Sequence, residues 1–446
     1  MAAHPLDFDA SVLPCSLVLP HAKRLDEAVM GAFCKILDLR PDECTAAVRT
    51  QVFLPRRFGG LQVSSAETMC TCARVATLVT HGHALRETVE AWQELEKCEP
   101  PLRPNALDGV AAEEHDLLDG LCQLGIRGLT GTGQPLAEVS GSSDPLRVHR
   151  PDTHLLSSYL GAAASAIFEK LRQVSDRESR ARLYSAGGPS AGSCFTAPLS
   201  MDGVHLADWQ ITEAMRFRLG IPQPGPRILC KNQKQNGDPC GAHVDAWGTH
   251  PIDCPVGPLR TRRHDDLADD YASILEECGA ISRREAFVLE FSSAEEAWLD
   301  VWSYGIPELT DLLLDISVRN PLADRYLAKA TEVPGAAAAA GEAEKEQRYP
   351  QSGGRRVWPV IYEAFGRAGD AAEQLLQILA AAYRRRAHRR GRACGMEIQR
   401  WRARLDATLQ RGIAAQLVSA RLGLPGRRTF RRRPLDMAAV EAGAVV

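Results

Sequence analysis

Five possible zinc ligands lie within 25 residues of this 446-residue chain, between Cys230 and Cys254. Zinc takes four thiolate or imidazole ligands in a tetrahedron, so a segment that supplies them restricts how the surrounding chain folds. The best set has the spacing Cys-x9-Cys-x9-His-x3-Cys and consists of Cys230, Cys240, His250 and Cys254. His243 is the reserve ligand, and unrelated cysteines in a loop are the alternative. We expect a structural zinc ion, because the segment has too few large apolar residues to fold alone.

The chain has 13 cysteines, an odd number without the spacing of a disulfide framework. Thiols and metal ligands are therefore favoured over disulfides. No apolar run approaches the roughly 18 residues of a membrane-spanning helix, and the first residues do not form a signal peptide. We expect an intracellular protein of about two to four domains that has no membrane partner.

The net charge of −3 hides an uneven distribution. Sixteen arginines and only two acidic residues lie between Ala381 and Pro434, which leaves 37 basic and 54 acidic residues for the rest. A basic tail on an acidic body suggests an anionic partner, and a solvated arginine-rich end is the alternative. The candidate nucleic-acid contacts in this region are Arg384, Arg385, Arg386, Arg389 and Arg390.

Three more arginines, Arg260, Arg262 and Arg263, lie at the N-terminal edge of a predicted helix that runs to Leu275. Guanidinium groups at this edge would be placed to reach the phosphates of a nucleic acid. The alternative is that they are surface charges, which balance the aspartates that follow them.

The run Leu312–Val318 is the strongest predicted strand of the chain, and it contains a carboxylate, Asp315. Period-two alternation places Asp315 on the face opposite Leu314 and Ile316. An unpaired carboxylate in an apolar strand costs several kcal/mol, which a metal ion or another cation would offset.

Two other strand-like runs also carry acids, Asp300 in residues 298–302 and Glu290 in residues 286–291. Asp300 and Asp315 on neighbouring strands could hold Mg²⁺ through oxygen ligands. Nucleases of the PD-(D/E)xK type have such a pair, with a lysine two residues after the second acid.

Ser317 occupies the position of that lysine in this chain. Lys345 is the candidate substitute, on a predicted helix over residues 342–349. Tyr349 lies four residues further on and therefore on the same helical face. A chance arrangement of two acids and a distant lysine is the alternative.

Several short motifs occur in the order found in the C-terminal part of non-LTR retrotransposon reverse transcriptases, and the resemblance covers most of residues 10–385. They resemble the start of the thumb, the linker, the zinc knuckle, the arginine–histidine helix and the restriction-enzyme-like endonuclease of those proteins. In that order, they are Leu54-Pro55-x3-Gly59-Gly60-Leu61; Arg180–Ser185 and Arg216–Gly220; Cys240-Gly241-Ala242-x2-Asp245-x2-Gly248-x-His250-x3-Cys254; Arg263-His264-Asp265; and Leu314–Val318, Lys345-x3-Tyr349 and Phe365-Gly366.

The resemblance implies a metal-dependent DNA endonuclease module in which Asp300 and Asp315 hold Mg²⁺ or Mn²⁺. Glu290 would be a third acidic ligand or a base that positions water. Lys345 would stabilise the pentavalent phosphate, and Tyr349 would orient Lys345 or the backbone. The expected partners are DNA or RNA, with no small-molecule substrate, and the expected location is the nucleus.

Two departures from the family matter. The chain contains no Tyr-x-Asp-Asp polymerase signature, so it looks like a C-terminal piece of such a protein without polymerase activity. Leu299 precedes Asp300, where the family has proline. A non-catalytic nucleic-acid-binding remnant is therefore the second hypothesis, and the unfolded product of a decayed gene is the third.

The predicted fold class is mixed, with a mainly α N-terminal half, a small zinc knuckle and an α/β restriction-endonuclease-like C-terminal domain. We expect five regions. They are a helical thumb-like region (1–104), a helical connector (105–225), the zinc knuckle (226–266), the endonuclease-like domain (267–385) and the arginine-rich tail (386–446).

Overall fold

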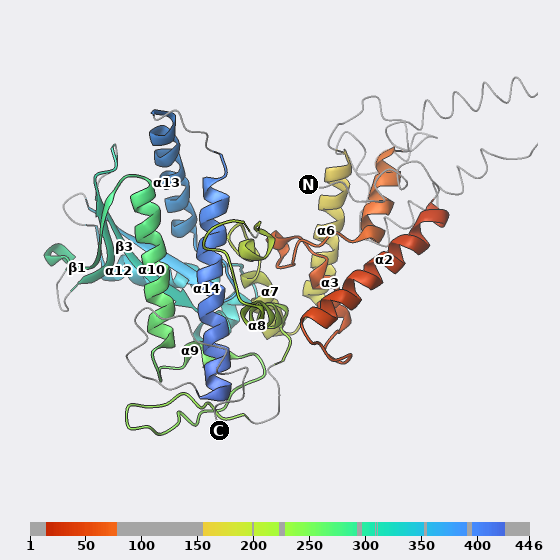
Figure 1. Cartoon of the computed structure of the whole chain (residues 1–446), viewed down its shortest axis with the longest axis horizontal. Helices are drawn as coiled ribbons and strands as arrows, with labels where there is room; N and C mark the ends of the chain where they lie inside the picture. The colour runs from red at the N-terminus through yellow and green to blue at the C-terminus, as the bar shows by residue number, and fades with distance from the viewer. Residues whose placement is uncertain are drawn as a thin grey trace, which may run out of the picture. The chain divides into compact units, whose positions relative to one another are not determined.

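The computed structural model of the chain describes residues 15–77, 155–198, 200–222, 228–291, 297–307, 309, 311–351, 355–389 and 395–423 (Figure 1). The chain forms two compact units, Met1–Gly187 (unit 1) and Gly188–Val446 (unit 2). The division falls inside the predicted connector of residues 105–225. Much of that connector, and the candidate contact Arg390, lie outside the described residues.

Unit 1 consists of helices and turns in its described part, as the sequence predicts. The elements are α2 (Cys15–Ile36), α3 (Ala46–Val52), the 3₁₀ turn η1 (Arg56–Phe58), residues 66–77, α6 (Leu155–Val174) and α7 (Arg177–Ser185).

The motif Leu54-Pro55-x3-Gly59-Gly60-Leu61 of unit 1 forms a tight turn around η1. Gly59 has a left-handed φ of +83°, and a Cβ on Gly60 would lie 1.8 Å from the carbonyl oxygen of Leu54. Only glycine fits at such positions. The turn brings Leu54 against Leu171 and Leu183 in a buried cluster.

Unit 2 is built on a four-stranded mixed sheet. Its strands are β1 (Ile281–Phe287), β2 (Trp298–Tyr304), β3 (Leu312–Arg319) and β4 (Val357–Glu363), in that order across the sheet. Strand β2 is antiparallel to both β1 and β3, and β4 is parallel to β3. Parallel neighbours need a long crossover, which α11 (Asp324–Ala330) and α12 (Ala336–Arg348) supply.

Three helices pack on this sheet. Helix α10 (Leu259–Glu277) contacts β1, β2 and β3, α12 contacts β3 and β4, and α13 (Asp370–Arg389) contacts β4. Helix α10 runs unbroken through the predicted boundary between residues 266 and 267. The regions predicted as a zinc knuckle and as an α/β domain therefore share this helix. The mixed α/β architecture of unit 2 agrees with the predicted fold class.

Helix α14 (Glu397–Leu422) corrects the prediction of an arginine-rich tail from residue 386 onward. It packs against α10, α13, α8 (Asp208–Leu219), α9 (Thr249–Asp253) and the 3₁₀ turn η3 (Ser193–Thr196). Trp401, Leu405 and Ile413 are fully buried in it. The predicted start of the tail also lies within α13, so residues 386–389 and 395–423 belong to the folded unit.

The arginines of α14 are accommodated in the folded unit because they pair with acidic side chains far away in the sequence. Arg402 lies 2.6 Å from Glu373, and Arg404 lies 2.8 Å from Glu277. A count of charges along the sequence does not include these partners, and it therefore overestimates how exposed the segment is.

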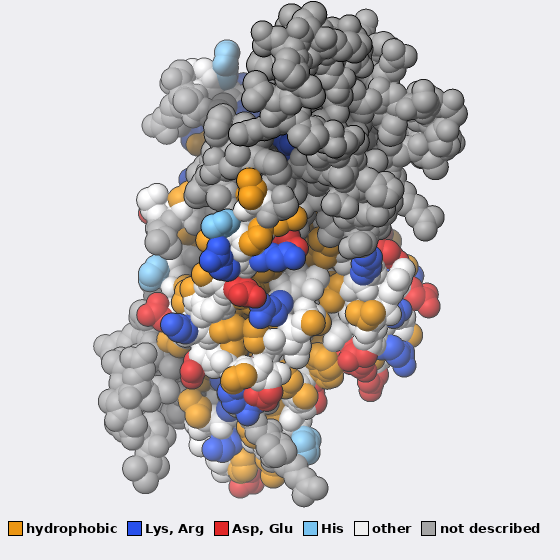
Figure 2. Space-filling model, turned by 90° about the vertical axis from the view of Figure 1, so that its right-hand side faces the viewer, with side chains coloured by type: hydrophobic (Ala, Val, Ile, Leu, Met, Phe, Trp, Pro, Cys, Tyr) orange, Lys and Arg blue, Asp and Glu red, His pale blue; other side chains and the backbone are white. Residues whose placement is uncertain are grey.

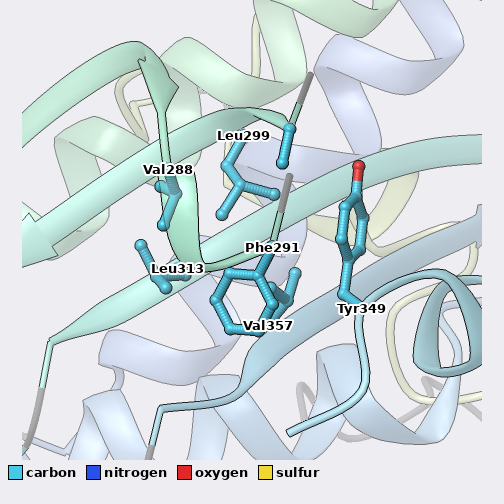
Figure 3. Packing of buried hydrophobic residues seen from close by; sticks show 7 residues of the cluster. Val288, Phe291, Leu299, Leu313, Tyr349 and Val357 are labelled. Atoms are coloured by element: carbon cyan, nitrogen blue, oxygen red, sulfur yellow. The ribbon is translucent and has the colours of Figure 1, made fainter. Parts of the chain in front are cut away.

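The predicted strand over residues 286–291 is wrong in its second half. Strand β1 ends at Phe287 and is followed by the 3₁₀ turn η4 (Leu289–Phe291). Val288 and Phe291 both enter the buried cluster shown in Figure 3, because residues three apart share one side of a 3₁₀ turn. The edge of the Phe291 ring meets Tyr349 at a centroid distance of 6.1 Å.

On the face shown in Figure 2, basic, acidic and hydrophobic side chains of the described residues are interspersed. Within the described residues, no helix combines the length and apolar character needed to cross a membrane.

Candidate metal centre and acidic site

The four predicted zinc ligands lie together at one end of unit 2. Residues 229–243 form a short antiparallel pairing in which the amide of Cys230 donates to Ala242 at 2.8 Å and that of Cys240 donates to Asn232 at 2.6 Å. This pairing brings Cys230 and Cys240 together. His250 lies on α9 and Cys254 directly follows it.

The ligand distances fit a tetrahedral zinc ion. With zinc about 2.3 Å from sulfur and about 2.0 Å from nitrogen, two sulfurs lie about 3.8 Å apart, and sulfur and nitrogen about 3.6 Å apart. The Sγ atom of Cys254 lies 3.9 Å from that of Cys230 and 3.8 Å from that of Cys240. Cys240 Sγ lies 3.5 Å from His250 Nε2. All four ligand atoms lie within 4.8 Å of one another, so the cluster could bind a metal such as zinc.

The pKa values of Cys230 and His250 also bear on the binding of a metal ion. Burial raises the pKa of the Cys230 thiol to about 12, and the neighbouring Cys254 and Cys240 act in the same direction. A metal ion would have to displace the proton of this thiol, and its positive charge would favour the thiolate. Burial lowers the pKa of His250, which keeps the imidazole in the neutral form that a metal binds.

The backbone around the cluster is held by Asp245 and by α14. The carboxylate of Asp245 accepts hydrogen bonds from the amides of Trp247, Thr249 and His250 at 2.9–3.0 Å, which fixes the start of α9. On the other side, the amide of Lys231 donates to Ala420 of α14 at 2.8 Å. The reserve ligand His243 is not part of the cluster.

The acidic site lies where β2 and β3 separate. Their pairing ends with Val301 opposite Leu314, so the next residues along the two strands are Asp300 and Asp315. The amide of Ile316 donates to the Asp300 carboxylate at 2.5 Å. The structure thus places the two predicted acids on adjacent strands.

Asp315 is buried and forms an ion pair with Lys345 of α12. The Lys345 Nζ atom donates to both carboxylate oxygens, at 2.8 and 2.7 Å, and only 8% of the Asp315 side chain is exposed. Burial raises the pKa of the Asp315 carboxyl, Lys345 opposes this shift, and the charge of Asp300 adds to it. The cation that an acid inside an apolar strand requires is therefore present, supplied by the helix on which the sequence analysis placed it.

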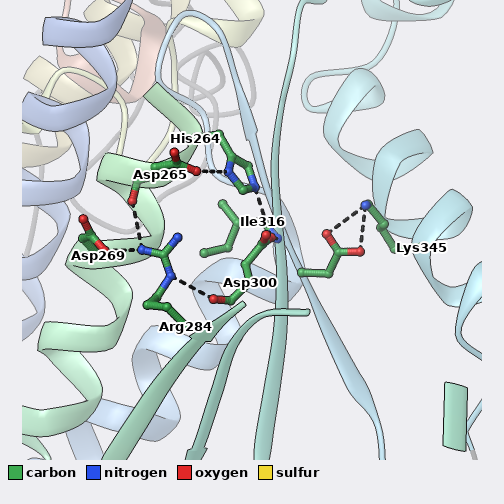
Figure 4. Close-up of polar contacts among 8 residues, drawn as sticks. His264, Asp265, Asp269, Arg284, Asp300, Ile316 and Lys345 are labelled. Atoms are coloured by element: carbon green, nitrogen blue, oxygen red, sulfur yellow. Dashed lines mark hydrogen bonds and ion pairs between the residues drawn. The ribbon is translucent and has the colours of Figure 1, made fainter. Parts of the chain in front are cut away.

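Asp300 is engaged from the opposite side by His264 of α10 (Figure 4). His264 Nε2 lies 3.1 Å from Asp300, and its Nδ1 lies 3.1 Å from Asp265. Burial lowers the pKa of His264, but hydrogen bonds to and charges on Asp300 and Asp265 outweigh it and raise the pKa to about 9. Only the motif Arg263-His264-Asp265 marked this histidine in the sequence, and no local spacing linked it to Asp300.

Two other predicted members of the site lie differently. Glu290 is exposed on η4, 3.5 Å from Arg355. Among the described residues it forms no group of possible metal ligands with Asp300 and Asp315, since the one such group of three or more is the cysteine–histidine cluster. Tyr349 directly follows α12, and its hydroxyl points out of the hydrophobic cluster (Figure 3) and hydrogen-bonds to Asp315. Its backbone amide donates to the carbonyl oxygen of Lys345 at 2.9 Å. Burial, followed by the charge of Asp315, raises the Tyr349 pKa to about 12.

The arginines at the start of α10 differ from one another. Arg260 is exposed, and Arg262 is half-buried with its Nε atom 3.8 Å from Asp266. Arg263 is buried and donates to Gln416 of α14 at 2.6 Å. The guanidinium of Arg263 is therefore buried between α10 and α14, and the predicted contact with nucleic acid stays a prediction.

The arginines of α13 lie at a cavity. Arg385, Arg386 and Arg389 line a space of about 320 Å³ together with Gly279 and Gly305. Arg386 also donates to the carbonyl oxygens of Glu276 and Glu277 at 3.5 and 3.4 Å. Arg384 points elsewhere and pairs with the buried carboxylate of Glu397.

No protein-family model matches this chain, and no curated protein matches it. Fold alone does not determine function, so the functional conclusion rests on the chemistry of the two sites.

Proposed function

We propose that the chain is a nucleic-acid-binding, metal-dependent DNA endonuclease module of a retrotransposon-derived protein, without polymerase activity. The observation that carries the proposal is the buried pair of Asp315 and Lys345, beside Asp300 at the point where β2 and β3 separate. Two acids on adjacent strands and a lysine on the crossover helix support a restriction-endonuclease-like fold for unit 2.

The residues of the acidic site suit cleavage of a phosphodiester. Lys345 can place its positive charge against the phosphate, where negative charge develops during attack by water. Asp315 keeps the amine in position, since it holds Nζ through both carboxylate oxygens. Tyr349 fixes Asp315 in turn.

A magnesium ion fits the donors present. Mg²⁺ binds through one or two carboxylates together with substrate phosphates and retained waters, and Asp300 and Asp315 are such carboxylates. Asp300 and Asp315 follow the last paired residues of two adjacent strands, and the charge of Asp300 adds to the rise in the pKa of Asp315. When bound, the ion would lower the pKa of a bound water and neutralise charge on the phosphate.

The nucleic acid would be held outside the acidic site. The cysteine–histidine cluster, with zinc bound, would fix the start of α10, on which Arg260 and Arg262 lie. The cavity lined by Arg385, Arg386 and Arg389 offers three guanidinium groups for backbone phosphates. Binding through such contacts would weaken steeply as the salt concentration rises.

Nicking of supercoiled DNA by the purified chain tests this proposal. We expect nicking with Mg²⁺ or Mn²⁺, none without a divalent cation, and a loss of at least about 100-fold in Asp315→Asn and Lys345→Met, since both remove groups that act on the phosphate. An intact plasmid, under conditions where a related endonuclease cuts it, would rule out the catalytic proposal. Asp315→Asn nicking at the parent rate would rule out the assignment of residues.

A non-catalytic nucleic-acid-binding protein is the second candidate. It is favoured by one observation, namely that both acids already have internal cationic partners, Lys345 for Asp315 and His264 for Asp300. In this case the chain would bind zinc and retain salt-sensitive binding to nucleic acid, and no divalent cation would produce nicks.

A further inference from the structure

A second cavity in unit 2, of about 280 Å³, lies where the segment before α8, the start of α10 and the middle of α14 come together. Helix α14 contacts both α8 and α10. Neither the zinc ligands nor the acidic site contribute to its lining. The side chains that give the cavity its chemistry are His205, Trp209, Gln210, Arg262, Asp266 and Arg411.

The walls of this cavity are fixed by hydrogen bonds and close packing. Arg411 Nη2 donates to the carbonyl oxygen of His205 at 3.2 Å, which ties the segment before α8 to α14. Gln210 Oε1 accepts a hydrogen bond from the amide of Ala207 at 2.9 Å. A Cβ on Gly412 would lie 2.5 Å from Cγ of Arg263, so glycine is needed there for α10 to approach α14.

The cavity carries an excess of positive charge beside an aromatic surface. Arg262 and Arg411 face one carboxylate, Asp266, whose pKa is raised by burial and lowered by the two arginines. Helix α10 begins here with no side-chain cap from Pro258 and no acidic residue in its first turn. Its first amides therefore add to the positive potential.

We propose that this cavity holds one nucleotide of a nucleic-acid strand, with the base against the indole of Trp209 and the phosphate near Arg262 and Arg411. The inference rests on the nucleic-acid binding of the proposed function, but not on cleavage. Bases stack on indole and guanidinium groups, and phosphates pair with arginine. A bare anion would make no contact with the indole. An apolar ligand would remove water from the guanidinium groups and offer them no hydrogen-bond acceptor, which costs free energy.

The test is the affinity of the full chain for a short fluorescent single-stranded DNA, measured by anisotropy without Mg²⁺ or Mn²⁺. We expect Trp209→Ala to weaken binding by about tenfold, since stacking of one base contributes that much. Trp209→Phe, which keeps a ring, should lose less than about threefold, and Arg262→Gln should lose several-fold. Arg325→Gln is the matched control, because Arg325 is exposed on α11 and lines neither arginine cavity.

Affinities of Trp209→Ala and Arg262→Gln equal to that of Arg325→Gln would overturn the inference. Circular dichroism and zinc content would establish that each variant is folded. If Trp209→Ala does not fold, Trp209→Phe and Arg262→Gln suffice for the test.

Competition with small molecules tests whether the cavity binds the base as well as the phosphate. We expect adenosine monophosphate to displace the strand, and inorganic phosphate at the same concentration to do so far less. Equal competition by both would overturn the role of the base. A chain that binds through Trp209 but never nicks DNA would contradict the endonuclease alone, whereas a chain that nicks with unchanged affinity in Trp209→Ala would contradict the cavity alone.

Discussion

The cysteine–histidine cluster and the acidic site differ in where their positive charge comes from. The cluster brings three thiols and one imidazole together and contains no cationic side chain among its four ligands. The acidic site provides its own cations, with Lys345 on Asp315 and His264 on Asp300. A metal ion could supply the positive charge that the four ligands of the cluster lack, whereas the two acids of the acidic site already have cationic partners. Folding should depend on metal at the first site, and a metal at the second should affect only chemistry.

Loss of zinc should have the largest effect. Cys254→Ser removes one of four ligands, and a structural zinc ion contributes on the order of 10 kcal/mol to the folding of the segment it binds. We expect the zinc content, measured by elemental analysis, to fall from one ion per chain to almost none, with a lower melting temperature of unit 2. His243→Gln is the control and should keep its zinc, because His243 is not in the cluster. Full zinc content in Cys254→Ser would contradict the assignment.

Breaking the pair at Asp315 should have the next largest effect. Asp315→Ala leaves the Lys345 amine in a mostly buried site without its partner, which costs about 3–5 kcal/mol of unfolding free energy. Replacing both residues, as Asp315→Leu with Lys345→Met, should recover most of this stability without any nicking. A double variant as unstable in urea as Asp315→Ala would show that the ion pair is not the reason for the loss.

The contact between His264 and Asp300 should make stability depend on pH. The pKa of His264 is about 9 in the folded protein and about 6.5 when unfolded, so its contribution is complete below about pH 6.5 and is lost as the pH rises through about 9. We expect His264→Gln to lose roughly 1–2 kcal/mol at about pH 6 and almost nothing at about pH 10, in magnesium-free buffer. A difference between parent and variant that is constant with pH would contradict this contact.

Glu290→Gln should have the smallest effect. Glu290 is exposed and its ion-pair partner Arg355 is also partly exposed, so the pair contributes less than about 1 kcal/mol. We expect unfolding in urea, and any nicking, to match the parent within error. A loss of nicking comparable to that of Asp315→Asn would return Glu290 to the acidic site.

The sequence predicts best what depends on local spacing. The zinc ligands come from one short segment, and the half His250-x3-Cys254 needs only one turn of α9 to converge. The strand around Asp315 is also predictable, because its alternation and its single carboxylate are local features. Lys345 is predicted as the substitute for the lysine missing after Asp315, although its distance along the chain leaves the pairing of the two residues open.

The contacts that the sequence does not predict join distant segments. His264 meets Asp300 only after α10 packs on the sheet, and Glu290 leaves the site only because β1 ends at Phe287. The sequence around Arg263 indicates a surface charge, whereas in the structure α14 covers it. Each of these depends on packing between elements, which neither periodicity nor charge along the chain contains.

Helix α14 has a consequence for synthesis of the protein. It is the last described element, yet it packs against the earlier elements η3, α8, α9, α10 and α13. Its Ala420 also accepts a hydrogen bond from Lys231, beside the cysteine–histidine cluster. Nascent chains tend to fold domain by domain from the N-terminus. Unit 2 cannot follow that order internally, because its early helices have no completed core until residues 397–422 leave the ribosome. The surfaces of α8 and α10 that α14 covers therefore lack this partner until translation has passed residue 422.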